Sequence, residues 1–259
     1  MDNIKTIFFV AGILLFLVSV LASAVLPVST LSHIEFTTID QIAADPTPEW
    51  RDLAERWPAQ FRAAFGAEAQ SQALLLPKNI RERPADAEAV AAATEAYGRA
   101  LDRGRDLYIG EGCWHCHSQY VRGASKEEQR WGPVASAQEY ENALYLPQVW
   151  GTRRVGPDLS RQWGTHTNDW QAAHLLDPRS TSPGSVMPAY TWYFEPNPDY
   201  RPEAVVRAAA ALLAERDRPA YLRQNLSQTP MVPNADGLAL IAYIQWLGSW
   251  NPERPWNAR

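Results

Sequence analysis

The stretch Cys113-Trp114-His115-Cys116-His117 decides the fold. Two residues separate its cysteines, a histidine follows the second one directly, and the chain has no other cysteine. This C-x-x-C-H spacing is the attachment motif of c-type haem, because two thiols bond to the vinyl groups of one haem and His117 reaches the iron from the adjoining turn. A zinc site would need a second pair of ligands, and a thioredoxin-like motif would need a βαβ context. The motif therefore predicts one covalently attached haem c, held by Cys113 and Cys116, with His117 as a metal ligand.

Two methionines beyond Met1 are candidates for the second axial ligand of the iron. Met187 lies in the loop Ser-Val-Met-Pro-Ala-Tyr at residues 185–190, well after the motif, and is followed directly by a proline. Met231 also precedes a proline, by two positions, but it adjoins the last expected helix. A thioether opposite a histidine is a common ligation for an electron-transfer haem, so we expect Met187 to be the metal ligand. The alternative is that either methionine only fills the core.

A second local pattern, Gly156-Pro157-Asp158-Leu159, follows the motif. In cytochromes c a loop of this kind lies beside the proximal histidine, and the proline carbonyl accepts its Nδ1–H, which fixes the ring. We expect Pro157 to have this role; the alternative is a simple turn.

Arg153 and Arg154 directly precede this loop. Guanidinium groups pair well with carboxylates, so both are candidates to neutralise the haem propionates. The alternative is that they are ordinary surface arginines, which are more common. The histidines outside the motif's last position are expected to be surface side chains or buried hydrogen-bonded ones, not metal ligands: His33, His115, His166 and His174.

Residues 7–26 contain no charge. At about 1.5 Å per residue they span roughly 30 Å, the thickness of a hydrocarbon core. The alternative is a cleaved signal peptide, because Ala22-Ser23-Ala24 resembles a cleavage site, but the apolar run is long for one. We therefore expect a transmembrane anchor at residues 7–28, after a cytoplasmic tail at residues 1–6. Lys5 is the only basic residue before the span and Asp2 partly offsets it, so the positive-inside rule favours a cytoplasmic N-terminus only weakly.

The rest of the chain is predicted to be mainly α-helical, with long loops and no strand. Helices are expected at 49–65 with a break at Pro58, at 86–106, at 168–176, at 202–216 and at 236–247, with a long loop at 123–157. The predicted domains are a linker and extra helical segment at 29–96, a cytochrome c domain at 97–250 with an insertion at 191–233, and a C-terminal tail at 251–259.

The formal net charge of −5 and the lack of a basic stripe exclude nucleic acid as a partner. No acid–base pair or nucleophile stands out, so any enzymatic chemistry is expected to belong to a partner subunit.

Three stretches carry a resemblance to a known family: GCWHCHSQYVR, WGTRRVGPDLSR and DWQAAHLLDPRSTSPGSVMPAY. They resemble the membrane-anchored mono-haem subunit of cbb-type cytochrome c oxidases, the FixO family. The resemblance implies a single-pass protein of the bacterial inner (plasma) membrane, with a class I-like cytochrome c domain on the periplasmic face and the N-terminus inside. It also implies electron relay from a quinol-oxidising complex or a soluble cytochrome to a polytopic haem–copper catalytic subunit that reduces oxygen.

The resemblance covers residues 97–190, and the segments 46–96 and 191–233 depart from it. Two alternatives therefore stay open: the related cytochrome c subunit of a bacterial nitric oxide reductase, and a free-standing anchored electron carrier. A haem enzyme or gas sensor with an open sixth position is a third, against which Met187 argues. Because both departing segments are rich in aromatics, at least one is expected to cover a neighbouring subunit or the base of the cytochrome domain.

Overall fold

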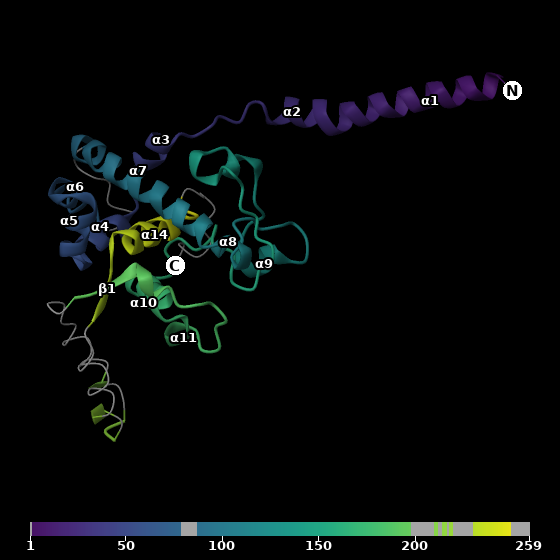
Figure 1. Cartoon of the computed structure of the whole chain (residues 1–259). Coiled ribbons are helices and arrows are strands. Elements are labelled where there is room, and N and C mark those ends of the chain that lie inside the picture. Colours follow the sequence, from purple (N-terminus) through teal and green to yellow (C-terminus); the bar gives the residue numbers. More distant parts are fainter. Residues whose placement is uncertain are drawn as a thin grey trace.

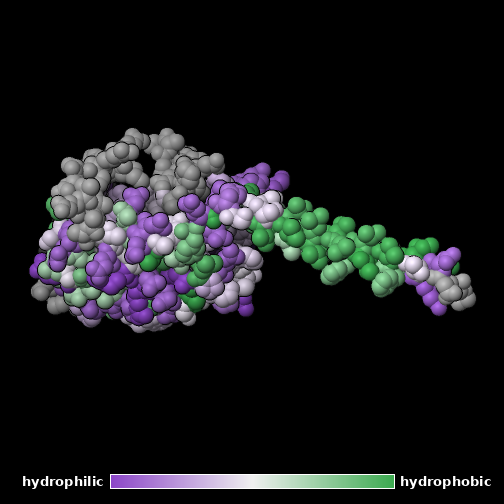
Figure 2. All heavy atoms as spheres, turned by 90° about the horizontal axis from the view of Figure 1, so that it is seen from above, coloured by the Kyte–Doolittle hydropathy of each residue, from purple (hydrophilic) through white to green (hydrophobic). Residues whose placement is uncertain are grey.

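A long apolar helix projects from a helical body in the computed structural model of the chain (Figure 1). The structure describes residues 2–78, 87–197 and 230–249, and a few positions between 210 and 219. Helix α1 (Asp2–Val20) continues through the π-helical turn η1 (Leu21–Val25) into α2 (Leu26–Leu31). Residues Asn3–Leu31 form a candidate membrane span, none of it buried in the body, and Figure 2 shows its continuous apolar surface. The predicted apolar helix is confirmed as one long enough to cross a membrane.

Two helices far apart in sequence cross at the centre of the body, α7 (Ala87–Gly110) and α14 (Ala235–Trp246). Gly104 of α7 lies at the crossing, where a Cβ atom would be 2.1 Å from the Ala239 carbonyl oxygen and 2.6 Å from Tyr243 Cβ. Asn234 caps α14 by accepting a hydrogen bond from Gly237 N–H (3.0 Å). Every residue of α14 from Gly237 to Trp246 is buried, so this helix is the middle of the core, and both helices lie where the sequence predicts them.

Four short helices pack against this pair: α3 (Ile39–Ala43), α4 (Pro48–Arg56), α5 (Pro58–Phe65) and α6 (Ala67–Ala73). The predicted break at Pro58 is confirmed. The Trp50 ring contacts Phe61, Phe65 and Tyr97 at centroid distances of 4.6, 4.9 and 5.2 Å. Helices α4 to α6 therefore share one core with α7 and α14, and this part of the departing segment covers the base of the cytochrome helices, as expected.

Between α7 and residue 193, the chain consists of loops and short helices. These helices are α8 (Cys113–Cys116), α9 (Glu127–Trp131), η2 (Ala137–Tyr140), η3 (Ala143–Tyr145), α10 (Asn168–Leu176), α11 (Pro178–Thr181) and η4 (Thr191–Tyr193). Helix α10 has the predicted bounds, and Thr167 caps it by accepting from Trp170 N–H (3.3 Å). The linker after α2 is tied to this segment, because Thr37 exchanges backbone hydrogen bonds with Glu141 (2.8 Å) and Ala143 (3.0 Å).

The expectation of no strand is wrong. Strands β1 (Phe194–Pro196) and β2 (Met231–Pro233) pair antiparallel, with Phe194 opposite Pro233 and Pro196 opposite Met231. Three residues are too few to show the two-residue periodicity by which a strand is recognised in sequence. The pair closes the base of the segment at 191–233. The helix expected at 202–216 lies largely outside the described residues.

Candidate haem-binding site

The cysteine motif sits where α7 ends. Gly112 has a φ of +70°, a left-handed conformation that suits glycine and turns the chain out of α7. One helical turn, α8, then carries both cysteines, and His117 N–H closes it by donating to the Cys113 carbonyl (2.9 Å). Both thiols are free and half-buried. Because residues three apart share a helix face, the two sulfurs are presented to one side of the turn.

The imidazole of His117 is held by the loop at residues 156–157. Its Nδ1 lies 3.0 Å from the Pro157 carbonyl oxygen, the contact expected from the sequence. Gly156 donates from its N–H to the Cys116 carbonyl (3.0 Å), and a Cβ there would be 2.4 Å from His117 Cε1. Burial lowers the pKa of His117, against the opposing effect of the Pro157 carbonyl. A neutral ring that donates from Nδ1 leaves Nε2 as the metal-ligating nitrogen.

The loop that contains Met187 lies beside the motif. Three residues after Met187, the Tyr190 side chain interacts electrostatically with the Cys113 thiol, and the Tyr190 N–H donates to the Leu175 carbonyl (2.8 Å). Met187 itself is half-buried and packs against the core. Met231 lies instead on β2, opposite Pro196, and is 37% exposed. The chain thus brings the Met187 loop to the cysteine turn.

Burial also shifts the pKa of the first motif cysteine. It raises the pKa of Cys113 to about 12, against the opposing hydrogen bond from Tyr190.

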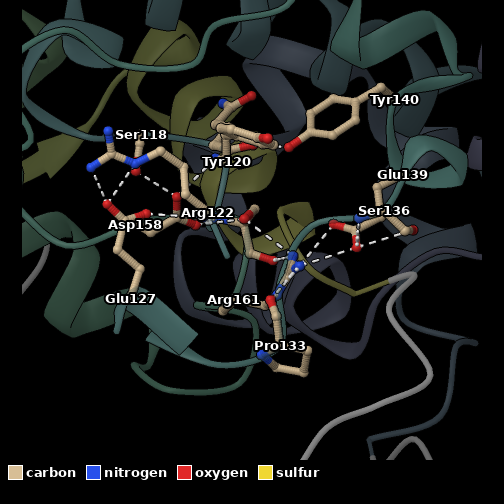
Figure 3. Close-up of polar contacts among 12 residues, drawn as sticks. Ser118, Tyr120, Arg122, Glu127, Pro133, Ser136, Glu139, Tyr140, Asp158 and Arg161 are labelled. Atoms are coloured by element: carbon tan, nitrogen blue, oxygen red, sulfur yellow. Dashed lines mark hydrogen bonds and ion pairs between the residues drawn. The ribbon is translucent and has the colours of Figure 1, made fainter. Parts of the chain in front are cut away.

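A buried carboxylate that the sequence did not reveal connects the residues after His117 to the residues after Pro157. Asp158 is 1% exposed and accepts hydrogen bonds from Ser118 Oγ, Tyr120 N–H (2.8 Å) and Ser160 N–H (2.9 Å) (Figure 3). A buried charge needs such partners. Asp158 therefore ties residues 118–120 to residues 158–160. Each stretch directly follows one partner of the His117–Pro157 contact.

A buried arginine extends this network and was also missed. Arg161, 2% exposed, pairs with Glu139 (2.9 Å) and donates to the Pro133 carbonyl (3.0 Å) and the Ser160 carbonyl (2.9 Å) (Figure 3). A buried ion pair is tolerated when its remaining donors are satisfied, as they are here. Through Pro133 and Glu139, Arg161 thus ties the long loop at 123–157 to the residues that follow Pro157.

The two arginines proposed for the propionates are placed differently. Arg154 pairs with Glu127 and donates to the carbonyls of Tyr120 (2.8 Å) and Trp150 (3.2 Å). Burial alone would raise the pKa of Glu127, but hydrogen bonds from Arg122 and Arg154 outweigh it and lower the pKa to about 2. In this structure Arg154 is therefore engaged with the protein, and Arg153 is exposed.

Two of the remaining histidines are hydrogen-bonded to threonine hydroxyls. His115 is bonded through Nδ1 to Thr152 Oγ1 (2.9 Å), and His174 through Nδ1 to Thr181 Oγ1 (2.6 Å). Among the described residues no cluster of three or more His, Cys, Asp or Glu side chains could hold a metal ion.

The residues at this turn fit a c-type haem. They offer two thiols on one helical turn, an imidazole with Nδ1 engaged by a carbonyl, a glycine that leaves room beside that ring, and a thioether in the adjacent loop. Such a group, when bound, supplies one-electron exchange.

Comparison with known proteins agrees with this chemistry. A family model described as the mono-heme subunit of cytochrome c oxidase, FixO, matches residues 85–214, which is 130 of the 259 residues. The matched range contains the cysteine turn, Pro157 and Met187. No curated protein matches the chain. The resemblance seen in the sequence is thus confirmed: the chain belongs to the FixO family, the mono-haem cytochrome c electron-transfer subunits of cbb3-type oxidases.

Proposed function

We propose that this chain relays single electrons from a quinol-oxidising complex or a soluble cytochrome to the polytopic haem–copper subunit that reduces oxygen. The observation that carries the proposal is the His117–Pro157 contact (3.0 Å) at the cysteine turn, inside the range matched by the FixO family. No catalytic residue is proposed in this chain, because the reduction of oxygen belongs to the partner.

The haem is proposed to be bonded covalently to Cys113 and Cys116, with His117 and Met187 as axial ligands. Pro157 orients His117, and its hydrogen bond raises the basicity of the ligand. With both axial positions filled by the protein, the iron has no open position for a substrate and exchanges electrons only. Arg153 is proposed to face a propionate, as is Arg154 if it exchanges Glu127 for that carboxylate.

The chain is proposed to sit in the bacterial inner membrane, with residues 1–6 in the cytoplasm and the cytochrome domain on the periplasmic face. The support is the resemblance, since members of this family carry the haem outside. The apolar span has no internal charge between residues 7 and 26, which argues against an ion pathway within this chain. The anchor then has one role, to keep the domain beside its membrane partner.

Purification of the full chain from its membrane in mild detergent tests the proposal. We expect it to come with a polytopic haem- and copper-containing subunit, and to keep its haem after denaturation in acid acetone. The reduced chain alone should not bind carbon monoxide. A chain purified without a partner would support the free-standing carrier, and a partner that reduces nitric oxide but not oxygen would support the reductase alternative. Haem extracted by acid acetone would contradict covalent attachment.

A further inference from the structure

Three rings four residues apart are stacked along one face of α10. His166 precedes the helix, and Trp170 and His174 lie within it. The centroids of His166 and Trp170 are 3.6 Å apart with 10° between the ring planes, and those of Trp170 and His174 are 4.5 Å apart with 11°. The i, i+4 spacing that puts side chains on one helix face accounts for their alignment.

Several aromatic pairs elsewhere in the body are tilted, although Trp114 and His115 also stack, with centroids 3.9 Å apart and 27° between the ring planes. Trp50 meets Phe61 at 56° and Tyr108 meets Tyr243 at 58°, as aromatic pairs in cores commonly do, at centroid distances of about 4.5–7 Å. The His166–Trp170 pair is closer than that range and nearly parallel. The three rings are therefore nearly parallel to one another along the helix face.

Both ends of the stack are fixed by hydrogen bonds. The backbone carbonyl of His166 accepts from the side chain of Gln245 (2.9 Å), which is 1% exposed on α14. At the other end Nδ1 of His174 is bonded to Thr181 Oγ1 of α11 (2.6 Å). These contacts fix the backbone at His166 and the ring of His174.

The stack runs from a half-exposed surface towards the haem site. His166, Trp170 and His174 are all half-exposed. The His174 end of the stack adjoins the loop that contains Met187, because the carbonyl of the next residue, Leu175, accepts from Tyr190 N–H (2.8 Å). The same helix leads through α11 into the loop of Met187. The stack is therefore accessible from the surface, and its His174 end adjoins the loop that contains Met187.

We propose that the rings of His166, Trp170 and His174 couple the haem electronically to the surface at α10, so that a one-electron redox partner exchanges electrons with it there. The inference rests on the proposed relay function and assigns its route. One electron passes from the reduced partner to the ferric iron, so the partner is oxidised by one electron and the iron reduced by one. No bond forms or breaks, and the three rings end in the state in which they began.

Light-driven electron injection into the full-length, haem-loaded chain in detergent tests the route without any natural partner. A ruthenium(II) polypyridyl photosensitiser is attached to Thr165→Cys, an exposed position beside His166. After excitation it gives one electron to the ferric iron and becomes ruthenium(III). The injection rate is compared between the unsubstituted Trp170 background, Trp170→Leu, which removes the ring, and Trp170→Phe, which keeps one. The control carries the same label at Glu128→Cys, an exposed position on α9.

We expect Trp170→Leu to slow injection from position 165 several-fold and to leave injection from position 128 unchanged. Trp170→Phe should retain most of the rate at both positions. The absorption spectrum and midpoint potential of the haem should be the same in all three backgrounds, since the change lies in the coupling and not in the driving force. An unchanged rate from position 165 in Trp170→Leu, or an equal loss from both positions, would overturn the proposed route.

These measurements are independent of oxidase turnover, so failure of the route and failure of the relay function are distinguishable. A chain with the expected injection rates that plays no part in donor-driven oxygen reduction would contradict the relay alone.

Discussion

Gly156 and Pro157 determine, at the scale of single residues, where the His117 ring lies. Gly156→Ala would put a Cβ atom 2.4 Å from Cε1 of that ring, and overpacking of this kind costs about 1–3 kcal/mol or moves the neighbouring group. We expect the displaced imidazole to ligate the iron poorly, with a mixed or high-spin absorption spectrum. Gly123→Ala is the control, because its Cβ would make an ordinary contact 3.7 Å from Val134. A fully low-spin Gly156→Ala spectrum would show that the ring tolerates the methyl group.

The two methionines give a matched pair of variants for the sixth ligand. Met187→Leu should remove the absorption band of methionine-ligated haem and lower the midpoint potential, because a thioether ligand raises it. Met231→Leu should change neither, since Met231 lies on β2 and is 37% exposed. Absorption spectroscopy and redox titration check both variants. The opposite pattern would make Met231 the ligand.

The site residues predicted from sequence are those whose partners are close in the chain or set by a motif. The C-x-x-C-H spacing is local, and the Gly-Pro-x-Leu loop anticipated the carbonyl that bonds His117. Asp158 and Arg161 could not be predicted, because their partners lie up to forty residues away and nothing in their own sequence marks them as buried. The spacing of His166, Trp170 and His174 was visible, but four-residue spacing shows a shared face and not a stack.

At the scale of elements, the crossing of α7 and α14 depends on Gly104. Gly104→Ala would place a methyl group 2.1 Å from the Ala239 carbonyl oxygen, so the helices must separate. We expect a loss of about 1–3 kcal/mol in the free energy of unfolding. Gly110→Ala on the same helix is the control, because its Cβ would meet nothing within 4 Å. Chemical denaturation of the two variants checks this, and equal midpoints would contradict the close crossing.

The helices were predicted better than their packing. The proline at residue 58 is a local signal, and helices α5, α10 and α14 lie close to where they were expected. The sequence predicted only that at least one of the extra segments covers a neighbouring subunit or the base of the domain. It did not predict that α4 to α6 share a core with α7, because the contact between Trp50 and Tyr97 joins residues far apart in the chain. Strands β1 and β2 were missed because each is three residues long.

At the scale of the whole molecule, the anchor does not pack against the body. A short linker joins them, and Thr37 of this linker is hydrogen-bonded to the body. Removal of residues 1–31 takes away the candidate span but no buried contact of the body. We expect the truncated chain, exported by a cleavable signal, to load its haem and stay in solution without detergent. Phase partitioning in a detergent that clouds on warming checks this. Detergent-phase behaviour of the truncated chain would mean that the body itself binds the membrane.

The central claim is that electrons from the natural donor reach the oxygen-reducing partner through the haem of this chain. The most direct measurement is oxygen consumption by the assembled complex carrying Cys113→Ala with Cys116→Ala. It is compared with the unsubstituted complex and with His115→Ala, which changes the motif at a residue whose side chain hydrogen-bonds Thr152 Oγ1 (2.9 Å). We predict that the double variant loses donor-driven oxygen reduction, while artificial reductants still reduce the partner's haems. His115→Ala should retain turnover. Donor-driven turnover that survives in an assembled complex without this haem would contradict the relay and leave the chain a structural role.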